Sequence, residues 1–372
     1  MKSVFFLPLT VALFGPVVHA QFANPWNTQM SRLVTQHNLP SLSVVLFDDQ
    51  KVLGQGVGGV RKIGTPEKVT VTDVHHLGSI SKSFTATLLG VLVEQKKLGF
   101  QSTLKELFPK LTIHPDLQNI TLDQLLSHRS GLMANLPDNM DWWDNTIPLQ
   151  ERRDDVLKTV LGTPPFRKPG TVFLYSNVGY ALAAMAAEKA TGQTYSQLLQ
   201  QHIFGPLHMN SCSVGFTWDT RTVSQPWPHK MDGGKAVAVL PVFPTAANGK
   251  VLAGNTEAIN GADNVRCSLP DLAKYLQAHM NGQNGQDSIL KASTFQELHK
   301  DHHGDKYAYG WNVYKDQRGT FFTHDGSNTL NYASMWILPE KRLGVVVTSN
   351  IGEVAAEAVH QGVNLAFDAL LK

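Results

Sequence analysis

Segments with strand and helix patterns are unevenly distributed along this chain, and their order limits the folds that it can adopt. Apolar or alternating segments typical of strands lie at residues 42–47, 52–60, 309–314, 319–323, 333–338 and 343–348. Helical patterns lie at residues 79–95, 120–126, 177–191, 269–280 and 354–371. We therefore expect an α+β fold, in which an antiparallel sheet from both chain ends is flanked by helices and carries an inserted, mostly helical domain.

The chain is long enough for two structural parts. It has 372 residues, of which 42% are hydrophobic, so it can bury more than one small core. We predict a sheet domain formed by residues 21–77 and 286–372, and a mostly helical domain formed by residues 78–285. The active site is expected in the cleft between the two domains.

Residues 1–20 have the composition of a secretory signal. Lys2 precedes an apolar stretch at 4–18, and Ala20 supplies the small residue that signal cleavage requires. The alternative is a membrane anchor, but two prolines and a glycine interrupt the stretch, which is short for a spanning helix. We expect cleavage before Gln21, a periplasmic or secreted protein, and no stable membrane insertion afterwards.

The charge balance gives no reason to expect a nucleic-acid partner. The formal net charge is only +2, and no block of like charges occurs along the sequence.

Two patterns that suggest a cofactor are not supported by their surroundings. The glycine-rich segment 54–59 has the spacing of a dinucleotide-binding loop, but a β-branched run follows it instead of a helix. The histidines at 75–76 and 299–303 lack the His-Glu-x-x-His spacing of a zinc site, and charged residues beside the second group indicate a solvated loop. We expect neither a metal nor an organic cofactor.

The two cysteines, Cys212 and Cys267, leave two interpretations open. In an oxidising compartment they can form a disulfide. They can equally be two separate buried residues, because the sequence gives no distance between them.

The candidate nucleophile is Ser79, which lies at or just before the first turn of the apolar helix predicted for residues 79–95. Free backbone N–H groups and the positive end of the helix dipole favour a developing negative charge there. Lys82 follows one turn later on the same face, and burial would lower its proton affinity so that it could accept the Ser79 proton. The alternative is a helix-capping serine beside a solvated lysine, because Ser-x-x-Lys often occurs by chance.

Two further segments carry candidate functional groups. Tyr175 and Asn177 offer a phenol and an amide, which together can relay a proton and hold a substrate; alternatively, Asn177 only caps the next helix. The segment 324–326 (His-Asp-Gly) includes Gly326, which would let a ligand lie along a strand edge. The alternative for this segment is a hairpin turn, which Asp-Gly favours.

In this order, the three segments resemble the motifs of the β-lactamase and penicillin-binding-protein superfamily: Ser-x-x-Lys at 79–82, Tyr-x-Asn at 175–177 and a Lys/His-x-Gly triad at 324–326. The likeness continues around them, in segments 78–86, 120–132, 206–209 and 343–350. The Tyr-x-Asn motif is similar to the one in class C β-lactamases, D-alanyl-D-alanine carboxypeptidases and related esterases. Class A enzymes have Ser-Asp-Asn at this position.

The resemblance implies a serine hydrolase that cleaves an ester, amide or lactam bond through an acyl-serine intermediate. Ser79 would attack the acyl carbon, and water would later cleave the acyl-enzyme. Lys82 and Tyr175 would share the general-base role and then protonate the leaving group.

The substrate-binding residues implied by the same resemblance are Asn177, His324, Gly326 and Ser327. Asn177 would orient the substrate, and His324 would take the place of the triad lysine. The backbone N–H groups of the nucleophile and of Ser327 would form the oxyanion hole.

Two departures from the family pattern bear on the substrate. His324 stands where strong β-lactamases carry lysine, and Asp325 stands where they carry a threonine that helps to hold the substrate carboxylate. An ionised Asp325 near that position would repel the carboxylate of a penicillin, whereas an Asp325 that points away from the pocket would not. We therefore expect neutral esters or amides to be hydrolysed better than β-lactams.

Two other functions are compatible with these residues. One is a D,D-carboxypeptidase acting on peptidoglycan peptides, for which an exported protein is equally suitable. The other is a penicillin-binding sensor that is acylated without turnover. Such receptors usually carry transmembrane helices, and no segment after the signal is long and apolar enough to form one.

Overall fold

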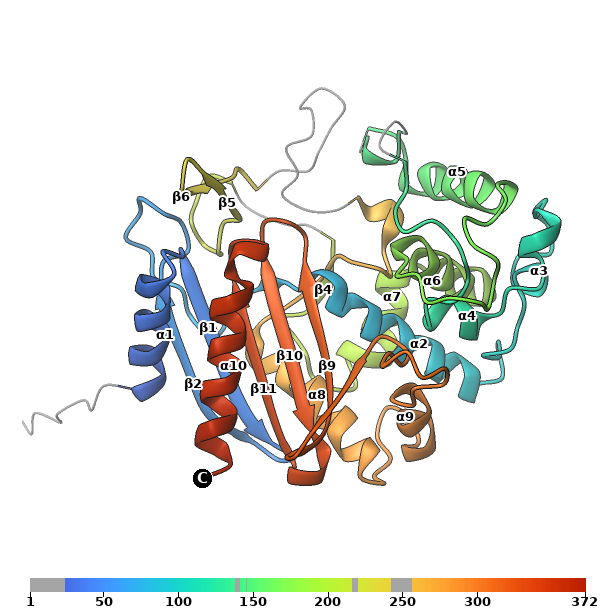
Figure 1. Ribbon diagram of the computed structural model, residues 1–372. Helices are drawn as coiled ribbons and strands as arrows, with labels where there is room; N and C mark the ends of the chain where they lie inside the picture. Colours follow the sequence, from blue (N-terminus) through green and yellow to red (C-terminus); the bar gives the residue numbers. More distant parts are fainter. Residues whose placement is uncertain (1–23, 138–140, 145, 216–219, 242–255) are drawn as a thin grey trace, which may run out of the picture.

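The computed structural model describes residues 24–137, 141–144, 146–215, 220–241 and 256–372, and its centre is a six-stranded antiparallel sheet (Figure 1). The strand order is β2-β1-β11-β10-β9-β8. The strands are β1 (Ser41–Asp48), β2 (Val52–Gly59), β8 (Asn312–Asp316), β9 (Gly319–Ser327), β10 (Tyr332–Leu338) and β11 (Leu343–Ser349). Since β1 pairs with β11, the two ends of the chain meet in one sheet and the expected fold class is confirmed.

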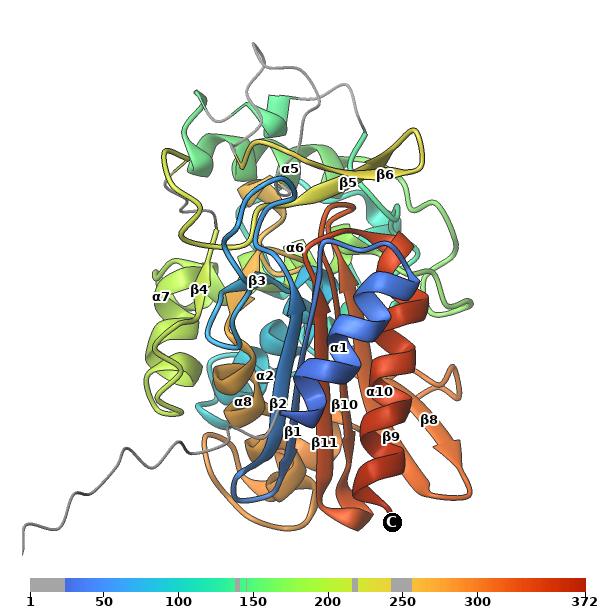
Figure 2. The same cartoon turned by 90° about the vertical axis from the view of Figure 1, so that its left-hand side faces the viewer.

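Helices cover both faces of this sheet. Two helices from the chain ends, α1 (Pro25–Gln36) and α10 (Ala356–Leu370), lie on one face, and α8 (Leu269–Gln283) packs on β1 and β11 from the other (Figure 2). The remaining helices are α2 (Ser81–Glu94), α3 (Leu104–Leu107), α4 (Leu122–Leu126), α5 (Leu149–Gly162), α6 (Asn177–Thr191), α7 (Tyr195–Leu199) and α9 (Ala292–Leu298). The residue limits that we predict for the two domains stay a prediction.

The central strands are apolar on both sides because each face meets its own core. In β1, Leu42, Val44 and Leu46 pack in the cluster that includes α1 and α10. Val45 and Phe47 point the opposite way, into the larger cluster that includes α2 and α8. This alternation explains why residues 42–47 form a nearly unbroken apolar run instead of an apolar-polar repeat.

The glycine-rich segment belongs to strand β2 and has a packing role. A methyl group on Gly56 would lie 2.4 Å from Cβ of Trp26, and one on Gly58 would lie 2.5 Å from the backbone nitrogen of Ser31. Helix α1 therefore lies directly on the backbone of β2, at a distance that only glycine allows. This close packing gives the glycines a structural explanation.

Helix boundaries in the middle of the chain follow local capping chemistry. Thr121 caps α4 and forms a capping box with Gln124, as the sequence led us to expect for the cap. Gly192 ends α6 in the left-handed conformation, with φ of +73°. Strand β8 begins at Asn312, three residues later than predicted, after a turn at Gly310 with φ of +77°.

The described residues also form two small sheets. One has the order β3-β7-β4 and joins β3 (His75–His76), β7 (Val265–Cys267) and β4 (Ser213–Val214), which are far apart in the sequence. The other is a hairpin of β5 (His229–Asp232) and β6 (Lys235–Ala238). No helix among the described residues combines the length and hydropathy needed to cross a membrane. The predicted signal at 1–20 lies outside the described residues.

Cys212 and Cys267 form a disulfide that closes a loop of 55 residues and holds β7 beside the segment that leads into β4. Replacing both by serine is expected to lower the free energy of unfolding by about 4 kcal/mol, because the unfolded chain regains the entropy of that loop. Urea denaturation of the oxidised protein and the double variant measures the difference. Reduced wild-type protein is the control, and equal urea midpoints for its oxidised and reduced forms would contradict the prediction.

Candidate active site

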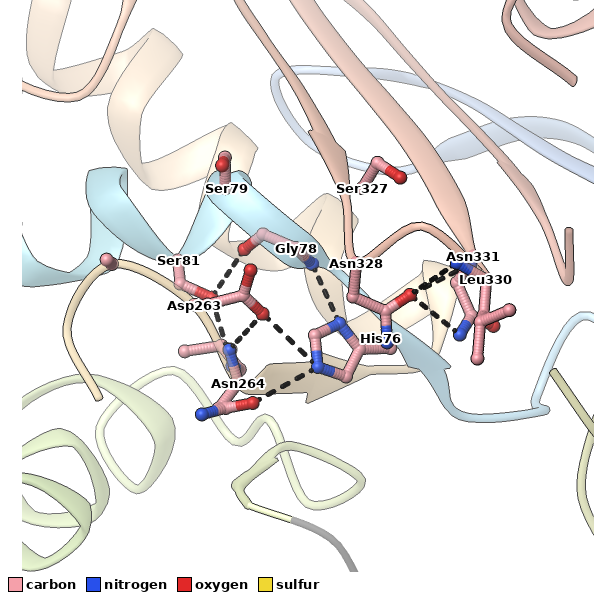
Figure 3. A network of polar contacts seen from close by, with 12 residues as sticks. His76, Gly78, Ser79, Ser81, Asp263, Asn264, Ser327, Asn328, Leu330 and Asn331 are labelled. Carbon is pink, nitrogen blue, oxygen red and sulfur yellow. Dashed lines mark hydrogen bonds and ion pairs between the residues drawn. The ribbon is translucent and has the colours of Figure 1, made fainter. Parts of the chain in front are cut away.

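Ser79 lies on a short 3-10 turn, Gly78–Ile80, that connects β3 to the start of α2. Gly78 has φ of +52°, a left-handed conformation that gives the chain a sharp bend immediately before the serine. Ser79 is half-buried, and its side chain points to the same side of the turn as Ser327 (Figure 3). The serine is therefore held by a fixed turn just before α2, which begins at Ser81, two residues later than the predicted helix.

Lys82 is completely buried, and its amine is surrounded by three oxygens. Nζ lies 3.0 Å from Ser79 Oγ, 2.6 Å from Asn177 Oδ1 and 2.9 Å from the carbonyl oxygen of Ala262. Two of these oxygens, on Asn177 and Ala262, can accept hydrogen bonds but cannot donate them. A neutral amine that donates its two hydrogens to them directs its lone pair at the Ser79 hydroxyl.

The protonation of Lys82 is suited to that arrangement. Burial lowers the pKa of Lys82 to about 7, against the opposing influence of the Asp263 carboxylate. At neutral pH a large share of the molecules therefore carry an uncharged amine beside Ser79. The alternative of a solvated lysine is wrong for this residue.

Tyr175 lies close to both Ser79 and Lys82. Its ring centroid is 4.7 Å from Lys82 Nζ, and its hydroxyl is a hydrogen-bonding neighbour of Ser79. Burial raises the pKa of Tyr175 well above its usual range, although the Ser79 hydrogen bond opposes the change. The phenol thus keeps its proton at neutral pH and can pass a proton on, while Lys82 is the group able to accept one.

Asn177 begins α6 but does not cap it. Ser176 is the capping residue, because its hydroxyl accepts the backbone N–H of Gly179. The Asn177 amide is therefore available to the site: its oxygen accepts from Lys82, and its nitrogen donates to Asn135 Oδ1 at 2.7 Å. The alternative in which Asn177 only caps the helix is wrong.

His324 lies within strand β9 and is uncharged. Its Nδ1 donates to the carbonyl oxygen of Asp325, so its Nε2 accepts the Tyr307 hydroxyl at 3.1 Å. Burial, with a further contribution from Lys82, lowers the pKa of His324 to about 4. At neutral pH this position offers a polar ring without the positive charge of a lysine.

Asp325 points away from the site, and this corrects the argument that it repels a penicillin carboxylate. Successive side chains of a strand face opposite ways, and Asp325 accepts hydrogen bonds from Tyr332, Ser334 and His360 on the α10 face of the sheet. The hairpin alternative for the same segment is also wrong, because Gly326 pairs with Ala333 inside the β9–β10 ladder.

Gly326 and Gly78 bring strand β9 against the serine turn. A methyl group on Gly78 would lie 2.3 Å from the backbone nitrogen of Ser327, and one on Gly326 would lie 2.9 Å from the backbone nitrogen of Ser79. The two backbone N–H groups therefore come from segments in direct contact. The oxyanion hole that these two groups would form stays a prediction.

The structure thus brings Ser79, Lys82, Tyr175, Asn177, His324, Gly326 and Ser327 into one region. It also adds groups that the sequence did not indicate: Asn135, the carbonyl of Ala262, Asp263 and Tyr307. These belong to loops or distant segments, and no spacing in the sequence marks them. Among the described residues, no group of His, Cys, Asp or Glu side chains is arranged to hold a metal ion.

Known proteins resemble this chain over most of its length. Protein flp of Staphylococcus aureus (strain COL) is 25% identical over 325 residues, which cover 84% of this chain and 60% of that protein. The chain therefore spans less than two thirds of the length of that relative. Penicillin-binding protein 4 of Amycolatopsis lactamdurans is 24% identical over 342 residues, which cover 88% of this chain and 85% of that protein.

Solved structures agree on the fold. The octameric penicillin-binding protein homologue from Pyrococcus abyssi superposes with a TM-score of 0.72 at 21% identity, covering 91% of this chain and 75% of that chain. The crystal structure of SurE superposes with a TM-score of 0.74 at 20% identity, covering 94% of this chain and 76% of that chain. Since the family model described as Beta-lactamase matches residues 26–367, the chain belongs to the beta-lactamase family.

Proposed function

We propose that this protein is a serine hydrolase that cleaves an ester, amide or lactam bond through an acyl group on Ser79. The observation that carries the proposal is the environment of Lys82: a buried amine between two acceptor oxygens, 3.0 Å from the Ser79 hydroxyl. Such an amine is a general base already in place beside its nucleophile.

In the acylation step, Ser79 Oγ bonds to the substrate's acyl carbon while its proton moves to Lys82 Nζ. The carbonyl oxygen becomes an oxyanion that accepts hydrogen bonds from the backbone N–H groups of Ser79 and Ser327. When the tetrahedral intermediate collapses, the bond to the leaving group breaks, and Tyr175 relays the proton from Lys82 to that group. A water molecule then gives a proton to Lys82 while its oxygen bonds to the acyl carbon. The bond between the acyl carbon and Ser79 Oγ breaks, the acid product leaves, and Lys82 returns the proton to Ser79 Oγ.

The substrate that best suits this site is uncharged near the reacting carbonyl. Neutral His324 gives no cation to hold a carboxylate, so the expected preference for neutral esters or amides is retained on this ground instead of on Asp325. We also propose that the segment 1–20 directs the protein to the periplasm or out of the cell, and that the substrate is a small molecule or peptide.

A second candidate is a D,D-carboxypeptidase, which the likeness to a penicillin-binding protein of Amycolatopsis lactamdurans favours. Its substrates end in a carboxylate, which a neutral His324 would hold less well than a lysine. Steady release of D-alanine from a D-Ala-D-Ala peptide, faster than ester hydrolysis, would favour this activity. A burst of acylation without turnover would instead indicate a penicillin-binding sensor.

The test is covalent labelling followed by peptide mapping. A fluorophosphonate probe is expected to label wild-type protein on Ser79 and to leave Ser79→Ala unlabelled. A fluorescent penicillin, used in parallel, reports whether β-lactams also acylate Ser79. For turnover, p-nitrophenyl butyrate is expected to be hydrolysed faster than nitrocefin. A label on another residue would refute the site, and a strong preference for nitrocefin would refute the substrate class.

A further inference from the structure

A buried polar network lies directly beneath the nucleophile turn (Figure 3). His76 precedes the turn, and its Nδ1 accepts the backbone N–H of Gly78 at 3.0 Å. The ring proton is therefore on Nε2, which lies 3.3 Å from Asp263 Oδ1 and 3.3 Å from Asn264 Oδ1. Both His76 and Asp263 are almost completely buried, with 1% and 4% of their surface exposed.

The loop that carries Asp263 is attached to the nucleophile segment at several points. The carbonyl of Ala262 accepts from Lys82, and the backbone N–H of Val265 donates to Ser81 Oγ at 3.0 Å. Ser81 Oγ in turn donates to the carbonyl of Gly78 at 2.7 Å. One short loop thus contacts the base and both sides of the turn that presents Ser79.

Charge gives this loop a second role. Five titratable side chains face Lys82 from the surrounding elements: Tyr175, Tyr180, His128, His324 and Asp263. Burial lowers the pKa of both histidines. Asp263 is the carboxylate in this set, and it raises the pKa of Lys82 against the effect of burial. Asp263 itself is faced by neutral His76 and by Arg266, a buried cation whose pKa burial lowers to about 9.

We propose that His76 and Asp263 are positioning residues for acylation of Ser79: His76 holds the Gly78 turn, and Asp263 holds the loop of the Lys82 acceptor and supplies the buried counter-charge to the lysine. The proposal rests on the proposed function, since it assigns these residues to the same reaction. Neither residue touches the reacting atoms, and both act through Gly78, Ala262 and Lys82.

The pH dependence of Ser79 labelling by a fluorophosphonate tests this role in Asp263→Asn. Removing the carboxylate leaves Lys82 with burial unopposed, so its pKa falls further and the neutral amine persists to lower pH. The midpoint of the acid limb is expected to move down by about one pH unit relative to wild type. A loss of packing alone would lower the rate at every pH without moving the midpoint.

A double variant covers the case in which Asp263→Asn fails to fold because buried Arg266 has lost the Asp263 carboxylate. The double variant Asp263→Asn/Arg266→Met removes both charges together, which proteins tolerate better than removing one. It is expected to show the same downward shift. The matched control is Asp73→Asn, a buried aspartate paired with Arg61 at 2.6 Å, for which the midpoint should not move.

The role of His76 is tested by two variants whose amide side chains differ in length. His76→Asn keeps an acceptor near the position of Nδ1 for Gly78 but loses the donor to Asp263, whereas His76→Gln keeps a group near Nε2 and loses the Gly78 contact. Both retain the Asp263 charge, so the plateau labelling rate should fall about tenfold with the midpoint unchanged.

The outcomes separate the two proposals. If wild-type Ser79 is not labelled at all, the proposed function fails. If wild type is labelled but both Asp263 variants keep the wild-type midpoint, or the His76 variants keep the wild-type rate, the positioning role is overturned.

Discussion

Lys82→Met is expected to lower kcat/KM for a neutral ester by about 10³- to 10⁴-fold, the upper range for loss of a general base. Methionine has a similar length and no branch, so it fills the buried space of the lysine. What it lacks is the amine that lies 3.0 Å from Ser79 Oγ. Steady-state kinetics measure the effect, and circular dichroism with a thermal melt shows whether the fold is kept.

The variant Lys82→Arg shows whether activity depends on the positive charge of Lys82 or on its ability to accept a proton. Arginine keeps the positive charge but cannot be deprotonated in a protein, so this variant should be as inactive as Lys82→Met. The exposed Lys97→Met, just beyond the end of α2, is the matched control and should keep wild-type activity. If Lys82→Met retained a tenth of wild-type kcat/KM, Lys82 would not be the base.

The assignment of Lys82 as the general base also determines the direction in which kcat/KM changes with pH. Only the neutral amine accepts a proton, and the pKa of Lys82 is about 7, so kcat/KM should rise with pH through a midpoint near that value. His324 and His128 titrate well below it because both are buried, and they do not account for a limb near neutrality. The residual activity of Lys82→Met should lack this limb.

Local spacing was enough to predict the parts of the site that are close together in the sequence. Ser79 and Lys82 are three residues apart across the turn that leads into α2, and this spacing places their side chains on one side of the segment. Tyr175 and Asn177 are likewise two residues apart, just before and at the start of α6. The sheet from both chain ends was also predictable, because the strand patterns occur only there.

The way in which the remaining site residues meet depends on contacts between distant segments, which no pattern in the sequence reveals. The sequence pattern predicts a strand that ends at residue 323, whereas β9 continues to Ser327 through its pairing with β10. That extension decides the orientation of Asp325, because its neighbour His324 takes the inward-facing position. The neutrality of His324 and Lys82 also required the structure, since burial shifts their pKa values.

Gly326→Ala is expected to lower kcat/KM by at least about 10³-fold, comparable to the loss of an oxyanion-hole donor. Its new methyl group would lie 1.9 Å from the carbonyl oxygen of Leu77 and 2.9 Å from the backbone nitrogen of Ser79. Both atoms belong to backbone, so strand β9 and the serine turn must move apart. The N–H groups of Ser79 and Ser327 would then no longer converge on one oxygen.

The same clash should also destabilise the fold, by about 1–3 kcal/mol as for other overpacked sites. Fluorophosphonate labelling, ester kinetics and urea denaturation therefore need to be measured on one preparation of Gly326→Ala. The matched control is Gly162→Ala at the end of α5, where nothing lies within 4 Å of the added methyl group and no change is expected. A fully active Gly326→Ala would show that β9 does not form one wall of the oxyanion hole, because a strand displaced by a methyl group cannot keep the same donor in place.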